Sequence, residues 1–131
     1  PIGHQLGEKP VINAEDLANE NFISIVPDTI LRARVDNTFN ELGLDRSNMM
    51  VETQSGASIC QMVASGLGVS IVDPFTASAF DSNKIVIRPF KPVIKFDFGV
   101  LLPMHKPSLK LADEFVELLE YKAKVFIEKK L

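Results

Sequence analysis

Polar residues collect directly after three short apolar segments of this 131-residue sequence, and their types suit the binding of a charged small molecule. The segments end at residues 26, 53 and 72, and the residues that follow them are Asp28, Thr29, Gln54, Ser55, Gly56, Ser58, Asp73 and Thr76. Where a helix begins after such a segment, its first backbone N–H groups lack acceptors inside the helix and favour an anion such as a carboxylate. The alternative, which stays open, is that Asp28, Ser55 and Thr76 only cap helices.

Residues with catalytic or metal-binding potential are few, and none stands in a spacing typical of an active site. The G-L-G at residues 66–68 lacks the third glycine of a dinucleotide fingerprint and precedes an apolar segment instead of following one. His4 and His105 have no His or Cys at metal-ligand spacing. Cys60 falls on an apolar helical stripe, which favours a small buried side chain over a nucleophile. We therefore expect no enzymatic activity, no metal and no cofactor.

The elements that must position the polar residues are predicted as strands and helices in alternation. Residues 49–53 suit a strand, residues 56–65 have a helical apolar spacing, and residues 69–72 suit a buried strand. Another strand at residues 22–26 precedes a helix near residues 28–42. Because strands joined by helices pair in parallel, these strands should form one parallel-rich sheet whose carboxyl ends share an edge. Ligands of open α/β sheets bind outside that edge, where the polar residues are expected.

The rest of the chain is predicted to add smaller elements and one long helix. The predictions are irregular or extended chain at residues 1–12, short helices at 14–18 and 76–80, turns at 81–83 and 90–92, strands at 84–88 and 93–102, and a helix from Ser108 to about residue 128. A net charge of −3 argues against a dedicated nucleic-acid surface. The single cysteine suits a reducing, cytoplasmic compartment, and no apolar run approaches the roughly 20 residues of a membrane span.

The segment VETQSGASICQMVASGLGVSIVDPF, at residues 51–75, resembles the effector-binding domain of LysR-type transcriptional regulators. In that family a strand ending near E-T is followed by a helix carrying V-A-x-G-x-G and by a strand that reads V-S-I-V. The start of the chain, PIGHQL, resembles the family's L-P-x-x-H-P-L without the leading Leu and with Gln5 in place of Pro. Residues 11–22 resemble its dL-x-x-x-x-F-I, and residues 108–119 resemble its closing helix.

The resemblance implies an α/β, periplasmic-binding-protein-like (type II) effector domain, in which two subdomains joined by crossing strands enclose a small effector. Residues 1–100 would be the second subdomain, and residues 101–131 would be a crossing segment and terminal helix that belong to the first. The chain would then be a fragment of a longer bacterial regulator that forms a dimer or tetramer. DNA would bind only to an N-terminal helix-turn-helix absent from this chain, and apolar residues at 111–119 would pack against the first subdomain.

The resemblance also suggests a class of effector. Cys60 together with I-V-D-P resembles the branch of the family that senses diaminopimelate, opines or similar amino-acid derivatives. Such ligands carry carboxylates, which suit helix N-termini at Ser55 and Asp28, and an amine, which suits the carboxylates of Asp28 and Asp73. The predicted effector-binding residues are Asp28, Thr29, Gln54, Ser55, Gly56, Ser58 and Asp73.

Two other functions remain alternatives. A solute-binding protein of a transporter shares the fold, and it would need a signal peptide or a lipoprotein cysteine upstream. A small α/β enzyme would need a nucleophile, an acid–base pair or a metal set. A helix-turn-helix in the upstream coding sequence would distinguish a regulator from both.

Overall fold

A computed structural model describes residues 1–45, 48–80, 83–104 and 109–130 and divides the chain into two compact units. The first unit spans Pro1–Phe96 and the second spans Asp97–Leu131. The predictions for His105, for the Ser108 helix cap and for a turn at residues 81–82 lie outside the described residues.

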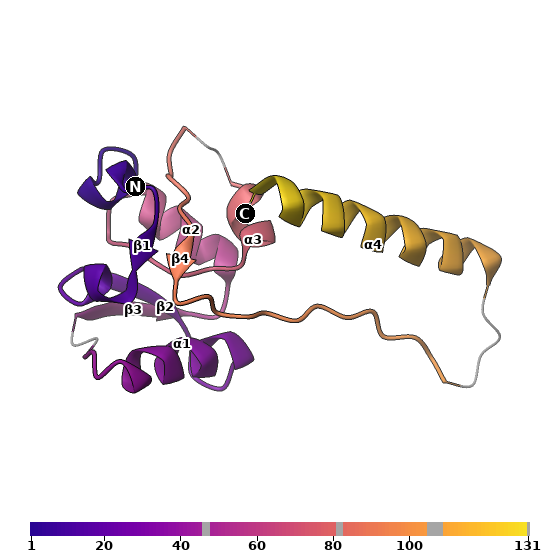
Figure 1. The fold of residues 1–131 in the computed structure, drawn as a ribbon, viewed down its shortest axis with the longest axis horizontal. Coiled ribbons are helices and arrows are strands. Elements are labelled where there is room, and N and C mark those ends of the chain that lie inside the picture. Colours follow the sequence, from indigo (N-terminus) through magenta and orange to yellow (C-terminus); the bar gives the residue numbers. More distant parts are fainter. Residues whose placement is uncertain (46–47, 81–82, 105–108, 131) are drawn as a thin grey trace. The chain divides into compact units, whose positions relative to one another are not determined.

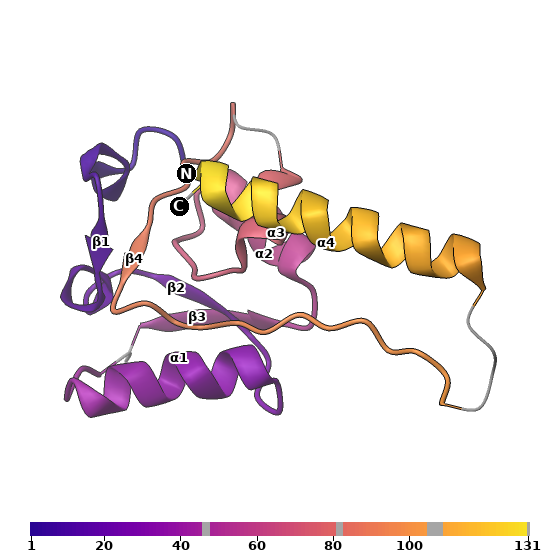
Figure 2. The ribbon, with the colours of Figure 1, turned by 45° about the vertical axis from the view of Figure 1, so that its right-hand side comes forward.

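Two parallel strands form the centre of the first unit. Strands β2 (Phe22–Ile25) and β3 (Met49–Thr53) pair in parallel, and Ile25 lies opposite Thr53 at their carboxyl ends. Helices α1 (Ile30–Glu41) and α2 (Gly56–Ala64) lie on opposite faces of this pair (Figure 1 and Figure 2). The prediction of parallel strands with flanking helices is confirmed for these elements, and both helices begin at the carboxyl edge of the pair.

The predicted third strand, at residues 69–72, joins this sheet by a single bridge. Val69 pairs in parallel with Phe22, its N–H donates to the Asn21 carbonyl oxygen, and the Ile23 N–H donates to the Val69 carbonyl oxygen, both at 2.9 Å. The Ser70 hydroxyl then donates to the Ile23 carbonyl oxygen at 2.6 Å. If the strand continued, the Ile23 carbonyl oxygen would accept a backbone N–H, but here it accepts the Ser70 hydroxyl instead. The predicted strand at residues 69–72 is therefore longer than the observed one.

Two helices begin at residues other than those predicted. The N-cap of α1 is Thr29, because Asp28 has a φ of +68°, a left-handed conformation that a helix cannot contain. The N-cap of α3 (Pro74–Ser78) is Asp73, and Pro74 fits the first turn because its missing N–H is not needed there. The predictions of caps at Asp28 and Thr76 are wrong, whereas Ser55 is the N-cap of α2 as predicted.

The second sheet is short and lies where a turn was predicted. Strand β1 (Ile12–Asn13) pairs in parallel with β4 (Phe90–Lys91). The predicted strand at residues 84–88 is wrong, because Ile85 is buried while Ile87, two residues on, is 45% exposed. The predicted strand at residues 93–102 is also wrong, because no strand among the described residues pairs with it and an extended segment needs a partner for its backbone groups.

The N-terminal residues are more ordered than predicted. A 3-10 helix, η1 (Gln5–Glu8), buries Leu6, and a second, η2 (Ala14–Leu17), stands where a short helix was predicted. Both contribute to the apolar core between α1 and the sheets, whose buried members are Leu6, Ile12, Ala14, Leu17, Phe22, Val35 and Phe39. The ring of Phe39 lies 6.5 Å from that of Phe22 and 6.3 Å from that of Phe90, so α1 ties β2 to β4.

The second unit contains helix α4 (Lys110–Lys130). Its apolar residues Leu111, Phe115 and Leu118 are all more than half exposed. The prediction that they pack against another part of a longer protein stays a prediction. Among the described helices, none is both long and apolar enough to cross a membrane.

Candidate functional site

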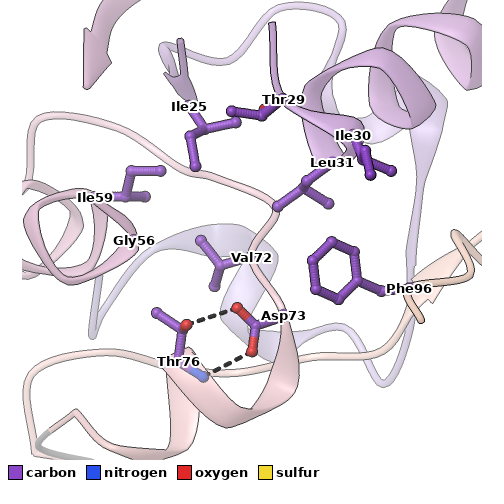
Figure 3. A pocket seen from close by; sticks show the side chains of 10 residues that line it. All are labelled: Ile25, Thr29, Ile30, Leu31, Gly56, Ile59, Val72, Asp73, Thr76 and Phe96. Carbon is purple, nitrogen blue, oxygen red and sulfur yellow. Dashed lines mark hydrogen bonds between the residues drawn. The ribbon is translucent and has the colours of Figure 1, made fainter. Parts of the chain in front are cut away.

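A cavity of about 390 Å³ lies at the carboxyl edge of the sheet, between the first turns of α1, α2 and α3. Figure 3 shows its lining residues, which are Ile25, Thr29, Ile30, Leu31, Gly56, Ile59, Val72, Asp73, Thr76 and Phe96. Most of the wall is apolar, and the polar side chains are two threonines and one aspartate. A mostly apolar cavity with a few polar groups is the usual form of a small-molecule site.

The N-caps of α1 and α2, Thr29 and Ser55, set the local geometry of this edge. The Thr29 hydroxyl accepts the Arg32 N–H at 3.2 Å and donates to the Val26 carbonyl oxygen at 3.3 Å, which fixes the start of α1 to the end of β2. The Ser55 hydroxyl accepts the Ser58 N–H at 3.4 Å at the start of α2. The remaining N–H groups of these first turns have no acceptor within their helix and are suited to a bound anion.

Asp73 and Thr76 form a closed pair in the wall of the cavity (Figure 3). The Thr76 N–H donates to Asp73 Oδ1 at 2.9 Å, and the Thr76 hydroxyl donates to Oδ2 at 2.6 Å. Gly56 lies against this pair, since a Cβ at that position would stand 2.8 Å from the Thr76 methyl group. The absence of a side chain at residue 56 therefore lets α2 approach α3 and leaves the first turn of α2 open to the cavity.

Arg32 holds the α1 side of the site to the sheet. Its Nη1 donates to the Ile25 carbonyl oxygen at 3.0 Å and to Glu52 at 2.5 Å, while its Nε donates to Asp36 at 2.8 Å. The guanidinium group thus links the last residue of β2, strand β3 and the second turn of α1. The sequence analysis missed this positioning residue, because no local signal distinguishes a helical arginine that bridges several elements from one that only faces solvent.

The predicted site residues divide into two groups in the structure. Thr29, Gly56 and Asp73 line the cavity. Asp28, Gln54, Ser55 and Ser58 lie beside them in the same loops and first turns but do not line it. Thr76, a candidate cap in the sequence, lines the cavity as the partner of Asp73. The apolar wall was missed; alternation along β2 could have indicated Ile25, whereas nothing in the sequence indicated Phe96.

Cys60 is a buried residue of α2, and the Asp73 charge acts on its thiol. Burial raises the pKa of its thiol above the ordinary value of 9.0, and the negative charge of Asp73 raises that pKa further. No group of three or more His, Cys, Asp or Glu side chains suited to a metal occurs among the described residues.

The raised pKa of Cys60 should make stability fall at alkaline pH. From about pH 9.0 upward the unfolded chain loses the thiol proton while the folded chain retains it, so the free energy of unfolding decreases as pH rises. Urea unfolding of the wild type and of Cys60→Ala between pH 7 and 10 measures this. The stability advantage of the wild type should be full below pH 8 and shrink above pH 9. An advantage that is constant over this range would contradict the expected shift.

Comparison with known proteins gives one consistent family. The profile of the LysR substrate binding domain matches residues 1–124. The regulatory protein NocR of Agrobacterium tumefaciens (strain T37) is 36% identical over 115 residues, which are 88% of this chain and 38% of NocR. The transcriptional activator protein LysR of Escherichia coli (strain K12) is 37% identical over 115 residues, which are 88% of this chain and 37% of that protein.

A solved structure agrees with the sequence relatives. The crystal structure of HinK, a LysR family transcriptional regulator from Pseudomonas aeruginosa, has a TM-score of 0.58 and 23% identity, and the match covers 72% of this chain and 32% of HinK. This likeness concerns the fold alone. The chain spans less than two fifths of the length of NocR and of the Escherichia coli protein.

Proposed function

Since this chain belongs to the LysR substrate-binding domain family, the effector-binding part of LysR-type transcriptional regulators, we propose that its cavity at the sheet edge holds the effector. Members of the family are regulators and not enzymes, and we propose that this domain acts by binding alone. Its effector would change how a full-length, oligomeric protein uses an N-terminal DNA-binding domain. Residues 1–100 would serve as the second subdomain of the effector domain, and residues 101–131 would return to the first.

The observation that carries the proposal is the meeting of two helix N-termini at one mostly apolar cavity. Gly56 of α2 and Thr29 of α1 both line it, so the first turns of both helices border the same space. A carboxylate placed there would gain from the N–H groups of these first turns and from the positive ends of both helix dipoles. The apolar wall would receive the hydrocarbon part of the effector. We propose a small carboxylate or amino-acid derivative as the ligand.

Within this proposal Ser55 lies beside the cavity and holds the first turn of α2 in place, because its hydroxyl accepts the Ser58 N–H. We expect Ser55→Ala in the full-length regulator to weaken effector affinity about tenfold, because the first turn of α2 would lose its cap and with it the fixed position of its N–H groups, and a hydrogen bond to a charged group contributes about 1.5–3 kcal/mol. A thermal-shift screen of small carboxylates and amino-acid derivatives supplies the ligand, and calorimetric titration measures its affinity.

Ser65→Ala is the matched control, since Ser65 is an exposed serine at the other end of α2. It should leave effector affinity unchanged. DNA affinity without effector should be the same in both variants. Equal effector affinities of Ser55→Ala and Ser65→Ala, at an unchanged melting temperature, would remove Ser55 from the site. Losing an N-cap alone costs about 0.5–2 kcal/mol of stability, so the melting temperature is measured beside each titration.

A further inference from the structure

The wall of the cavity includes one aromatic side chain, Phe96, which comes from a segment that belongs to neither sheet. Its ring stands across the cavity from Ile59 of α2 (Figure 3). Phe96 is 36% exposed and Ile30, another lining residue, is 69% exposed, so both keep apolar surface in contact with water. A ligand that covers such surface gains affinity in proportion to the apolar area that it removes from water.

The segment that carries Phe96 is held by α1 and the core, and not by strand pairing. Residues 93–96 pair with no strand in the part of the chain that the structure describes. The guanidinium group of Arg34, on α1, donates through Nη1 to the carbonyl oxygen of Lys95. Ile94 packs against the apolar core that α1 shares with the sheets. These two contacts come directly before Phe96 in the chain, so they set where its ring enters the cavity.

We propose that Phe96 is a specificity-determining residue of the effector site and that Arg34 is the residue that positions it. A carboxylate held at the first turn of α2 lies on the Gly56 side of the cavity, so its hydrocarbon chain must cross the space to reach Phe96. A short chain ends before the ring, whereas a longer chain covers it. This inference rests on the proposed effector function and adds the length of the apolar part that the effector carries.

Straight-chain carboxylates test this length preference, because they differ only in their methylene groups. Octanoate extends butanoate by four methylene groups, and each one that is buried raises affinity about fourfold. Calorimetric titration of the full-length wild type should therefore show octanoate binding about 100-fold more tightly than butanoate.

Phe96→Ala should lower this ratio about tenfold, because octanoate loses the ring that covers its far end while butanoate does not reach it. Val93→Ala is the matched control; Val93 lies on the same segment, is 76% exposed and does not line the cavity. It should retain the wild-type ratio. If Phe96→Ala melts well below the wild type, Phe96→Val, whose apolar side chain is shorter than that of phenylalanine, replaces it with the same expected direction.

Arg34→Met should lower the ratio in the same direction, since methionine cannot donate to the carbonyl oxygen of Lys95. Arg34→Lys should retain more of the ratio, because an ammonium group can donate to that oxygen. This rescue separates the positioning of Phe96 from a general loss of structure. Lys84→Met is the control for charge, because Lys84 is exposed, lies outside the cavity and its loss changes the net charge equally.

A fluorescent reporter follows the position of residue 96 without any ligand. The 131-residue chain contains no tryptophan, so Phe96→Trp adds one whose emission is read after subtraction of the wild-type signal. Adding Arg34→Met to this variant should shift the emission to longer wavelength, because release of the segment would expose the indole to water. Adding Lys84→Met should leave the emission where it was.

Three results would overturn the inference. They are an octanoate-to-butanoate ratio that is equal in the wild type and Phe96→Ala, a ratio or an emission maximum that Arg34→Met leaves unchanged, and no saturable binding of octanoate. The effector function is judged separately, by the titrations of Ser55→Ala and Ser65→Ala with the ligand found by screening. Octanoate binding that does not depend on Phe96 would therefore end the role of this ring and leave the effector site intact.

Discussion

Replacing Gly68 with alanine should destabilise this domain by about 3 kcal/mol or more, at the upper end of the cost of overpacking. A Cβ at residue 68 would stand 2.1 Å from the carbonyl oxygen of Asn21, and this neighbour is backbone that cannot rotate away. The same carbonyl oxygen accepts the N–H of Val69 at 2.9 Å. Relief of the clash would therefore break the single bridge that attaches residues 69–72 to β2.

Urea unfolding measures this effect, with Gly99→Ala as the control. Nothing lies within 4 Å of a Cβ at Gly99, so that substitution should change the free energy of unfolding by no more than about 0.5 kcal/mol. A Gly68→Ala variant as stable as Gly99→Ala would mean that the chain at residue 68 does not approach Asn21 this closely. Gly68 was interpreted in the sequence as part of a helix stop; the close backbone contact gives it a second and larger role.

The centre of the fold was predictable because its signals are local. The apolar segments at residues 22–26 and 49–53, each followed by a helical pattern, predicted β2, α1, β3 and α2, and the parallel pairing followed from the connections. The match to the LysR substrate-binding domain family confirms the resemblance and the periplasmic-binding-protein-like (type II) fold class. The order of short motifs along the chain carried that resemblance.

The errors lie where a strand depends on a distant partner. Residues 84–88 alternate as a strand does, yet β1 is only two residues long and pairs with residues 90–91 instead. Residue 88 contacts the N-terminal segment through its side chain and not through strand pairing, since the Arg88 guanidinium donates to the carbonyl oxygens of Lys9 and Gly7. The alternation of apolar residues within one segment does not determine which strand it pairs with.

The candidate site was half predictable for a similar reason. Caps follow from residue type and position, so Ser55 was found, but Asp28 was preferred to Thr29 because the sequence does not reveal a positive φ. The apolar wall comes from four separate segments, and only the fold brings Leu31, Val72 and Phe96 together. The space between them, which decides the shape of a ligand, has no counterpart in the sequence.

Filling that space should abolish effector binding. Val72 stands among the lining residues (Figure 3), and Val72→Phe would place an aromatic ring where the hydrocarbon part of the effector is proposed to lie. We expect effector affinity to fall about 100-fold or more, which equals about 2.7 kcal/mol. The fold should survive, because the ring enters existing space and Val72 is only partly buried. Leu67→Phe is the matched control, since Leu67 is 41% exposed and lies outside the cavity.

Calorimetric titration of the full-length wild type, Val72→Phe and Leu67→Phe with the effector found by screening tests the central proposal most directly. If the cavity at the edge of β2 and β3 holds the effector, Leu67→Phe binds as the wild type does, and Val72→Phe binds at least about 100-fold more weakly at an unchanged melting temperature. Wild-type affinity in Val72→Phe would contradict the proposal and place the effector elsewhere in the protein.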